Sequence, residues 1–342
     1  MLDFHCFDHP ESWLWSFSQA MEHLRAAGAS EQSIREQEEI QKEATLGIGP
    51  VTAYPPGIRR RTPDTSLGGC LDETMPILSQ CAGKAMEAAG ISPHEVDFVL
   101  TACTIFNPKP SLAEMIMHEF GMRSDCQNYN LSGQGSSAGV MLVSLARDLL
   151  TANPGTVALI LAHDNVTCSL GKWLPLYAAN VPFRAGGSAA ILSSRPWDRR
   201  RAKYQLLHTV SVNQVADISS NGVYMRSPVI NATAASAIST NIRHMAARML
   251  PLPLLVKAAR SRDQNFVPDF SSAFQHVCIH PGASTYYILA HLESRVGVNK
   301  GDKILQLGMG PCFKCCSAVW KALRSINTKH PCWQFQSPSQ MP

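Results

Sequence analysis

The chain has 342 residues, of which 45% are hydrophobic and 16% are charged, and its formal net charge at pH 7 is +4. A chain of this length and composition can bury a large hydrophobic core, so an intrinsically disordered protein is excluded. The net charge is small for the length, and basic residues are not interleaved with aromatic ones as on a nucleic-acid-binding surface. We therefore expect no nucleic acid among the partners.

Cysteine usage and hydropathy predict the cellular environment. The 11 cysteines are scattered along the chain without the spacing of a disulfide framework, which is typical of reduced thiols in the cytosol. No stretch approaches the roughly 20 apolar residues that a membrane-spanning helix requires. The N-terminus carries acidic residues and histidine where a signal peptide would carry basic and apolar regions. These features predict a cytoplasmic protein.

The first 69 residues are the least regular part of the chain. Residues 31–44 are an acidic stretch of helical character, and residues 49–69 are rich in proline, glycine and arginine, as in an irregular loop. We assign residues 1–69 to a variable N-terminal segment.

Strands and helices alternate after this segment. Residues 72–89 carry apolar residues at helical spacing, residues 97–104 have the composition of a buried strand, and Ser111 is a candidate N-cap of a helix. The alternation predicts the α/β fold class. The later elements are expected as helices at 136–152 and 284–294 and as strands at 156–164, 186–195, 203–213, 274–280, 303–310 and 313–323.

A glycine-rich turn, SGQGSSAG at residues 132–139, precedes an apolar helix. Small residues let the backbone turn sharply and place one side chain at the N-terminus of the helix. The helix dipole and the free amides there stabilise an anion, as a nucleophile requires. The alternative is a turn that serves packing alone. Periodicity does not decide between the two interpretations.

One interpretation of this turn makes Ser137 the nucleophile. The residues G-S-S-A-G at 135–139 match the G-x-S-x-G motif of α/β-hydrolases. That motif should follow a strongly apolar strand, whereas the preceding residues are CQNYNLSG, and no convincing acid lies between Ser137 and His280. The hydrolase is therefore the less favoured hypothesis.

Two further patterns were considered as binding sites. Cys312 and Cys315 have CxxC spacing, but no second pair of ligands stands at zinc-finger distance, so we predict no metal site. The basic runs 59–61 and 199–201 contain guanidinium groups that can bind phosphate in a bidentate manner. Runs of this kind are more often solvated surface.

Six long blocks of the chain carry a resemblance to a known family. They are FNPKPSLAEMI (106–116), NLSGQGSSAGV (130–140), FRAGGSAAILSSR (183–195), AKYQLLHTV (202–210), PDFSSAFQHVCIH (268–280) and PCFKCCSAVWKAL (311–323). These blocks resemble the plant very-long-chain 3-ketoacyl-CoA synthases, the condensing enzymes of fatty-acid elongation. The resemblance implies a thiolase-like fold of two similar α/β halves stacked in five layers. It divides the chain into an N-terminal half at 70–197, with the nucleophile turn, and a C-terminal half at 198–342, with the catalytic histidine.

The resemblance also implies site residues. Ser136 stands where the family has its acylated cysteine, and His280 and His276 match family histidines. A third family histidine is replaced by Asn213. A thiol is readily activated by a helix terminus, whereas a serine hydroxyl needs a positioned base. We therefore expect Ser136 to be acylated slowly.

The chain departs from the family after His280. It passes from HPGA almost directly to STYYILAHLES, where family members have a helix and a strand that ends in a turn with a catalytic asparagine. We expect a second half shortened by one edge strand and its helix. Losing one donor of a thioester clamp costs about a hundredfold or more in rate.

The resemblance implies condensation of a long-chain acyl-CoA with malonyl-CoA, without metal or redox cofactor, in the synthesis of waxes, suberin and cuticular lipids. It also implies a homodimer, or a heterodimer with another synthase, and other elongase subunits as partners. Family members are anchored in the endoplasmic reticulum, so we expect this chain in the cytoplasm or peripheral at that membrane. The alternative is a non-catalytic relative that dimerises with an active synthase and modulates it.

Overall fold

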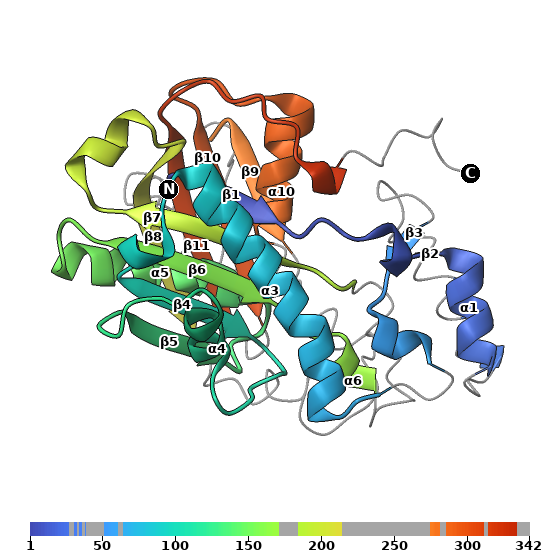
Figure 1. Ribbon diagram of the computed structural model, residues 1–342. Coiled ribbons are helices and arrows are strands. Elements are labelled where there is room, and N and C mark those ends of the chain that lie inside the picture. Colours follow the sequence, from blue (N-terminus) through green and yellow to red (C-terminus); the bar gives the residue numbers. More distant parts are fainter. Residues whose placement is uncertain are drawn as a thin grey trace.

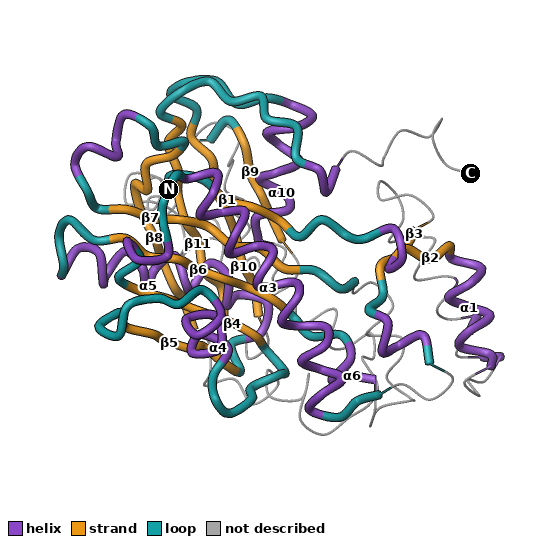
Figure 2. Tube along the Cα trace, in the orientation of Figure 1, coloured by secondary structure: helices purple, strands orange, loops and turns teal. Residues whose placement is uncertain are grey.

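The computed structural model forms a layered α/β molecule in which two mixed sheets face each other across a pair of helices (Figure 1). A two-stranded sheet and a short helix lie to one side of this body (Figure 2). The structure describes residues 1–26, 31–32, 34–35, 38, 51–60, 64–170, 184–213, 274–280, 285–310 and 314–333.

The first sheet has five strands in the order β1-β7-β6-β4-β5. β4 runs parallel to both β5 and β6, whereas β7 is antiparallel to β6 and to β1. Every residue of β4 and β6 is buried, as expected for central strands that are covered on both faces. The strands are β1 (Phe4–Cys6), β4 (Phe98–Cys103), β5 (Gln127–Ser132), β6 (Val157–His163) and β7 (Gly187–Ser193).

Helices cover both faces of this sheet. α3 (Leu67–Ala89) and α4 (Leu112–Glu119) lie on the outer face, and α5 (Ala138–Ala152) packs on the inner face. The predicted N-cap Ser111 is confirmed, because its hydroxyl accepts a hydrogen bond from the backbone amide of Glu114 at the start of α4.

The second sheet has four described strands in the order β8-β11-β10-β9. β9 and β10 are parallel, whereas β11 is antiparallel to β10 and to β8. The helix α10 (Thr285–His291) continues into a π-turn at Leu292–Val296. The strands are β8 (Tyr204–Asn213), β9 (His276–His280), β10 (Lys303–Gly310) and β11 (Lys314–Ala322).

The two sheets correspond strand for strand over four positions, β1 to β8, β7 to β11, β6 to β10 and β4 to β9. β5 occupies the fifth position of the first sheet, and no described strand lies beyond β9 in the second. α5 contacts both sheets and α10 contacts β9, β1 and β7, so these helices form the layer between them. The predicted fifth layer falls outside the described part of the chain.

The N-terminal segment forms a small sheet of β2 (Leu14–Ser16) and β3 (Val51–Ala53) beside α1 (Phe17–Ala26). The predicted acidic helix at 31–44 falls largely outside the described residues. A short helix, α6 (Thr167–Leu170), follows β6. Within the described part, no helix is both long and apolar enough to cross a bilayer.

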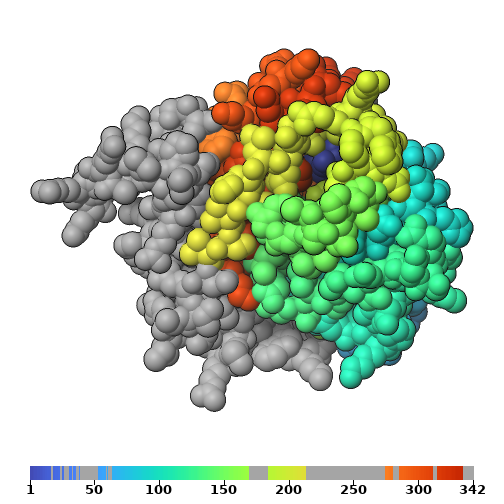
Figure 3. All heavy atoms as spheres, turned by 90° about the vertical axis from the view of Figure 1, so that its left-hand side faces the viewer, coloured from blue at the N-terminus to red at the C-terminus, as the bar shows by residue number. Residues whose placement is uncertain are grey.

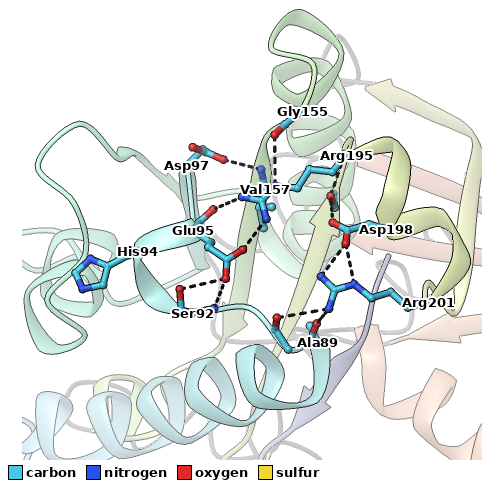
Figure 4. A network of polar contacts seen from close by, with 12 residues as sticks. Ala89, Ser92, His94, Glu95, Asp97, Gly155, Val157, Arg195, Asp198 and Arg201 are labelled. Atoms are coloured by element: carbon cyan, nitrogen blue, oxygen red, sulfur yellow. Dashed lines mark hydrogen bonds and ion pairs between the residues drawn. The ribbon is translucent and has the colours of Figure 1, made fainter.

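The basic stretch 195–201, which follows β7, forms ion pairs within itself and with the turn before β4 (Figure 4). Arg195 binds Glu95 at 2.8 Å, and Arg201 binds the buried carboxylate of Asp198 at 2.7 Å and the carbonyl of Ala89. These contacts fasten the stretch to the C-terminal end of α3 and to the turn before β4. The Arg201 guanidinium group is therefore already bonded within the fold and is not available to a phosphate ligand.

A buried charge network joins the start of β8 to the C-terminal residues. The Glu293 carboxylate accepts from Lys203 Nζ at 3.0 Å, His330 Nε2 at 2.7 Å and Tyr204 Oη at 2.8 Å, and Lys203 also pairs with Asp3 at 2.8 Å. In Figure 3 the first residues of the chain (blue) lie at the base of a hollow framed by yellow and yellow-green atoms, which the colour bar assigns to the stretch 184–213. Burial alone would raise the pKa of Glu293, but the His330 hydrogen bond and the Lys203 charge lower it below its ordinary value.

We expect Lys203→Met to lower the free energy of unfolding by about 3–5 kcal/mol, because it leaves buried carboxylates without their cation. A carboxyl whose folded pKa is lowered stabilises the fold above its unfolded pKa and loses this contribution as the pH falls through the folded pKa. The difference from wild type should therefore shrink below pH 4.5, the ordinary value for glutamate. Urea unfolding at several pH values measures both effects.

Lys84→Met is the control, because Lys84 pairs with Glu87 at 3.6 Å on the surface. It should cost less than about 1 kcal/mol. Equal losses for the two variants would show that the buried network adds nothing to stability.

Candidate active site

The turn between β5 and α5 begins where the parallel strand β5 ends. Gly133 and Gly135 have positive φ angles of 65° and 60°, which side chains with a Cβ atom rarely adopt. A single 3₁₀ turn, Gly135–Ser137, then leads into α5. The glycines therefore allow the sharp strand-to-helix turn that the sequence predicts.

The two serines of this turn face different surroundings. Ser137 is fully buried, and its hydroxyl donates to the carbonyl oxygen of Gln134 at 2.8 Å. Ser136 is half-buried, and among the described residues no group forms a hydrogen bond with its hydroxyl. Ser136 is therefore the less enclosed of the two serines, whereas the Ser137 hydroxyl is bonded within the turn.

The second half of the chain closes against this turn. A Cβ atom on Gly310, the last residue of β10, would lie 2.6 Å from the Gln134 carbonyl oxygen and 2.9 Å from Ser137 Oγ. A Cβ atom on Gly139 would lie 2.3 Å from the hydroxyl of Thr285, the first residue of α10. The candidate site therefore lies between the two halves, at a point where their backbones touch.

The two predicted histidines lie at opposite ends of β9. His280 is the last residue of the strand and pairs with Gly308, so it lies near the end of β10 that meets the turn. Its side chain lies outside the described part. His276 Nε2 lies 3.1 Å from Asp302 Oδ2. Four residues of strand separate the histidines by about 13 Å, so the structure does not bring His276 to Ser136.

A further polar contact reaches the turn from β11. Lys314 Nζ donates to Gln134 Oε1 at 2.7 Å, and Gln134 Nε2 donates to the carbonyl of Ser132 at 3.2 Å. Sequence analysis missed Lys314, although the residue lies in one of the blocks that carry the resemblance. A lysine in a strand has no periodicity or spacing that marks it, since its partner is 180 residues away.

The family model described as FAE1/Type III polyketide synthase-like protein matches residues 1–261 of the chain. The chain belongs to this family. It is 30% identical over 388 residues to 3-ketoacyl-CoA synthase 2 of Arabidopsis thaliana, a match that covers 96% of the chain and 73% of that relative. It is 29% identical to 3-ketoacyl-CoA synthase 11 of the same plant over 96% and 76%, respectively.

Solved structures, among them that of a fungal type III polyketide synthase, share the fold. CsyB complexed with CoA-SH matches with a TM-score of 0.73 and 15% identity, covering 94% of this chain and 99% of that one. The fungal synthase ORAS matches with a TM-score of 0.71 and 14% identity over 94% and 99%. The predicted α/β fold is thereby confirmed as the thiolase-like fold of these enzymes.

Membership of the FAE1/type III polyketide synthase-like family overturns the hydrolase hypothesis. The fold is that of condensing enzymes, and Ser137 is wholly enclosed with its proton donated to Gln134. The G-x-S-x-G match is wrong as a nucleophile motif because adjacent residues of a sharp turn point in different directions. A five-residue pattern does not encode which of them faces the solvent.

The connection between β9 and α10 is shorter than the corresponding connection in the first half. In the first half, β4 leads through α4 and β5 to the turn and α5, whereas in the second half only residues 281–284 separate β9 from α10. The aligned stretch of 388 residues exceeds the 342 residues of the chain, so the alignment also contains positions that this chain lacks.

The described residues contain no cluster of three histidine, cysteine, aspartate or glutamate side chains suited to a metal ion. Cys315 and Cys316 are buried in β11, and burial raises the pKa of Cys315 to about 12. Cys312 lies outside the described part. The two described thiols of this block are therefore protonated core residues.

We expect Gly310→Ala to lower the free energy of unfolding by about 1–3 kcal/mol, because the new methyl group would overlap the backbone of the turn. Urea unfolding measures the loss. Gly68→Ala in the first turn of α3 is the control, because its Cβ atom would lie 3.6 Å from the nearest atom. Wild-type stability of Gly310→Ala would contradict the close approach of β10 to the turn.

Proposed function

We propose that the protein condenses a long-chain acyl-CoA with malonyl-CoA in very-long-chain fatty acid biosynthesis. The observation that carries this proposal is the half-buried Ser136 at the start of a buried helix, where the two halves of a condensing-enzyme fold meet. The similarity to plant 3-ketoacyl-CoA synthases supports the substrate class. The CoA-SH complex of CsyB supports a CoA thioester as substrate.

In the proposed reaction, Ser136 Oγ attacks the thioester carbonyl of the acyl-CoA. The acyl group moves to the serine, and CoA leaves as a thiol with the serine proton. Malonyl-CoA then loses CO2, and the resulting carbanion attacks the serine ester. This releases the 3-ketoacyl-CoA and leaves Ser136 as an alkoxide, which takes up a proton from the solvent. The free amides at the start of α5 stabilise the negative charge of each tetrahedral intermediate.

We assign to His280 the transfer of the Ser136 proton, because it ends β9 on the side where β10 meets the turn. His276 is bound to Asp302 at the other end of the strand, which favours a structural role. The proposed architecture is two similar halves in five layers, the second shortened after His280. The strand correspondence and the long aligned stretch support it.

A second candidate function is a non-catalytic relative that dimerises with an active synthase and modulates it. Two observations favour it. No described base contacts Ser136, and the segment that carries the family asparagine has no counterpart between β9 and α10. For either function we propose a homodimer or a heterodimer with another synthase, together with other elongase subunits, in the cytoplasm or peripheral at the endoplasmic reticulum.

The two functions predict different results in an elongation assay. Purified protein is incubated with radiolabelled malonyl-CoA and a long-chain acyl-CoA. We expect product from wild type, at least tenfold more from Ser136→Cys because a thiolate is the better nucleophile, and none from Ser136→Ala or His280→Ala. Ser79→Ala is the control, and it should retain activity because the Ser79 hydroxyl binds Glu119 on the outer face of the first sheet, away from the turn.

If neither wild type nor Ser136→Cys makes product while circular dichroism shows an intact fold, the proposed condensing activity is contradicted. Co-purification of such inactive protein with a full-length synthase, and a change in that synthase's product yield, would then support the modulating relative.

A further inference from the structure

We propose that Lys314 is a positioning residue that clamps the nucleophile turn through Gln134 and gives residue 136 a cationic neighbour that favours an anion there. The inference deepens the proposed function, since it concerns the residue that we take as the nucleophile. It rests on contacts of the turn that no local sequence pattern marks.

Both polar atoms of the Gln134 side-chain amide form hydrogen bonds. Its carbonyl oxygen accepts from Lys314 at 2.7 Å, and its amide nitrogen donates to the carbonyl of Ser132 at 3.2 Å. The backbone oxygen of Gln134 accepts from the Ser137 hydroxyl at 2.8 Å and faces Gly310. Gln134, two residues before Ser136, is therefore hydrogen-bonded to β5 and β11 through its side chain and to Ser137 of the turn through its backbone oxygen.

Among the described residues, Lys314 is also the charged side chain that forms a hydrogen bond with the turn. The elements packed against the turn are β5, β10, β11 and α5. β5 contains no charged residue, and the remaining charged residues of these elements lie at the ends remote from the turn. They are Lys303, Lys321, Arg147 and Asp148.

The uncharged titratable groups that face this region do not supply a competing charge. Cys316 lies in β11 next to Ser211, and burial raises the pKa of its thiol, while the Lys314 charge acts in the opposite direction. Tyr129 on β5 donates its hydroxyl to Gln127 at the start of that strand. His280 ends β9, and its side chain lies outside the described part.

The consequence concerns the chemistry of residue 136. A half-buried ammonium group near a helix N-terminus adds to the positive potential of the free amides. Both act on a nucleophilic anion and on the oxyanion of an acyl intermediate. The clamp also keeps the turn in one conformation, so that the amides and the charge are aligned before a substrate binds.

The test places a reporter thiol at the nucleophile position. In a Ser136→Cys background, the rate of alkylation by iodoacetamide is followed by mass spectrometry of the peptide that contains residue 136, over a range of pH. We expect Lys314→Met to raise the pKa of the introduced thiol by about one unit and to slow alkylation at pH 7 by up to about tenfold, since an opposite charge nearby favours the ionised form. The rate at high pH, where all of the thiol is ionised, should stay the same.

Two matched variants separate charge from structure. Lys314→Arg should keep the low pKa because it retains the cation, and Lys321→Met, an exposed lysine at the far end of the same strand, should leave the profile unchanged. An unaltered pKa in Lys314→Met would overturn the proposal. So would a Lys314→Arg profile that matches Lys314→Met, because the charge would then be irrelevant.

The reporter works whether or not the protein condenses substrates. A shifted pKa in a protein that makes no product would support the role of Lys314 and contradict only the proposed function. An unshifted pKa in an active enzyme would do the reverse.

Discussion

The close approach of the two halves at the nucleophile turn is the constraint on which the rest of the structure depends. Gly139 lies against Thr285, and Gly310 lies against Gln134, with no space for a methyl group in either place. The turn is therefore shaped by β10 and α10 as much as by its own sequence. A close-packed contact of this kind transmits displacements, so the position of Ser136 depends on both sheets.

The core of the second half does not need a longer connection between β9 and α10. The largest fully buried side chains of the second half, Trp320, Tyr204 and Tyr286, lie on β11, β8 and α10, all of which are present. The Glu293 network holds the same half together at the end of α10 remote from the turn. A stable fold is thus compatible with the loss of a catalytic donor, which is why an active enzyme and a non-catalytic relative both remain testable functions of the same family.

Serine at position 136 changes what the surroundings must supply. A helix terminus and one cation ionise a thiol near neutral pH, but a hydroxyl has a far higher pKa and needs a base in contact. In the proposed reaction, Lys314 stabilises the anion without removing the proton, so acylation also needs a proton acceptor, the role proposed for His280. The two proposals therefore give the clamp and the histidine separate tasks at the same turn.

The sequence by itself determined the alternation of strands and helices, the Ser111 cap, the glycine-rich turn and, through several long blocks, the family. These features depend on neighbouring residues, whose periodicity and turn chemistry are visible in one dimension. Only the tertiary structure decided that Ser137 is enclosed while Ser136 is half-buried, that His276 and His280 lie at opposite ends of one strand, and that Lys314 reaches Gln134. Such contacts join residues far apart in the chain, or depend on which way a side chain turns, and neither property leaves a local pattern.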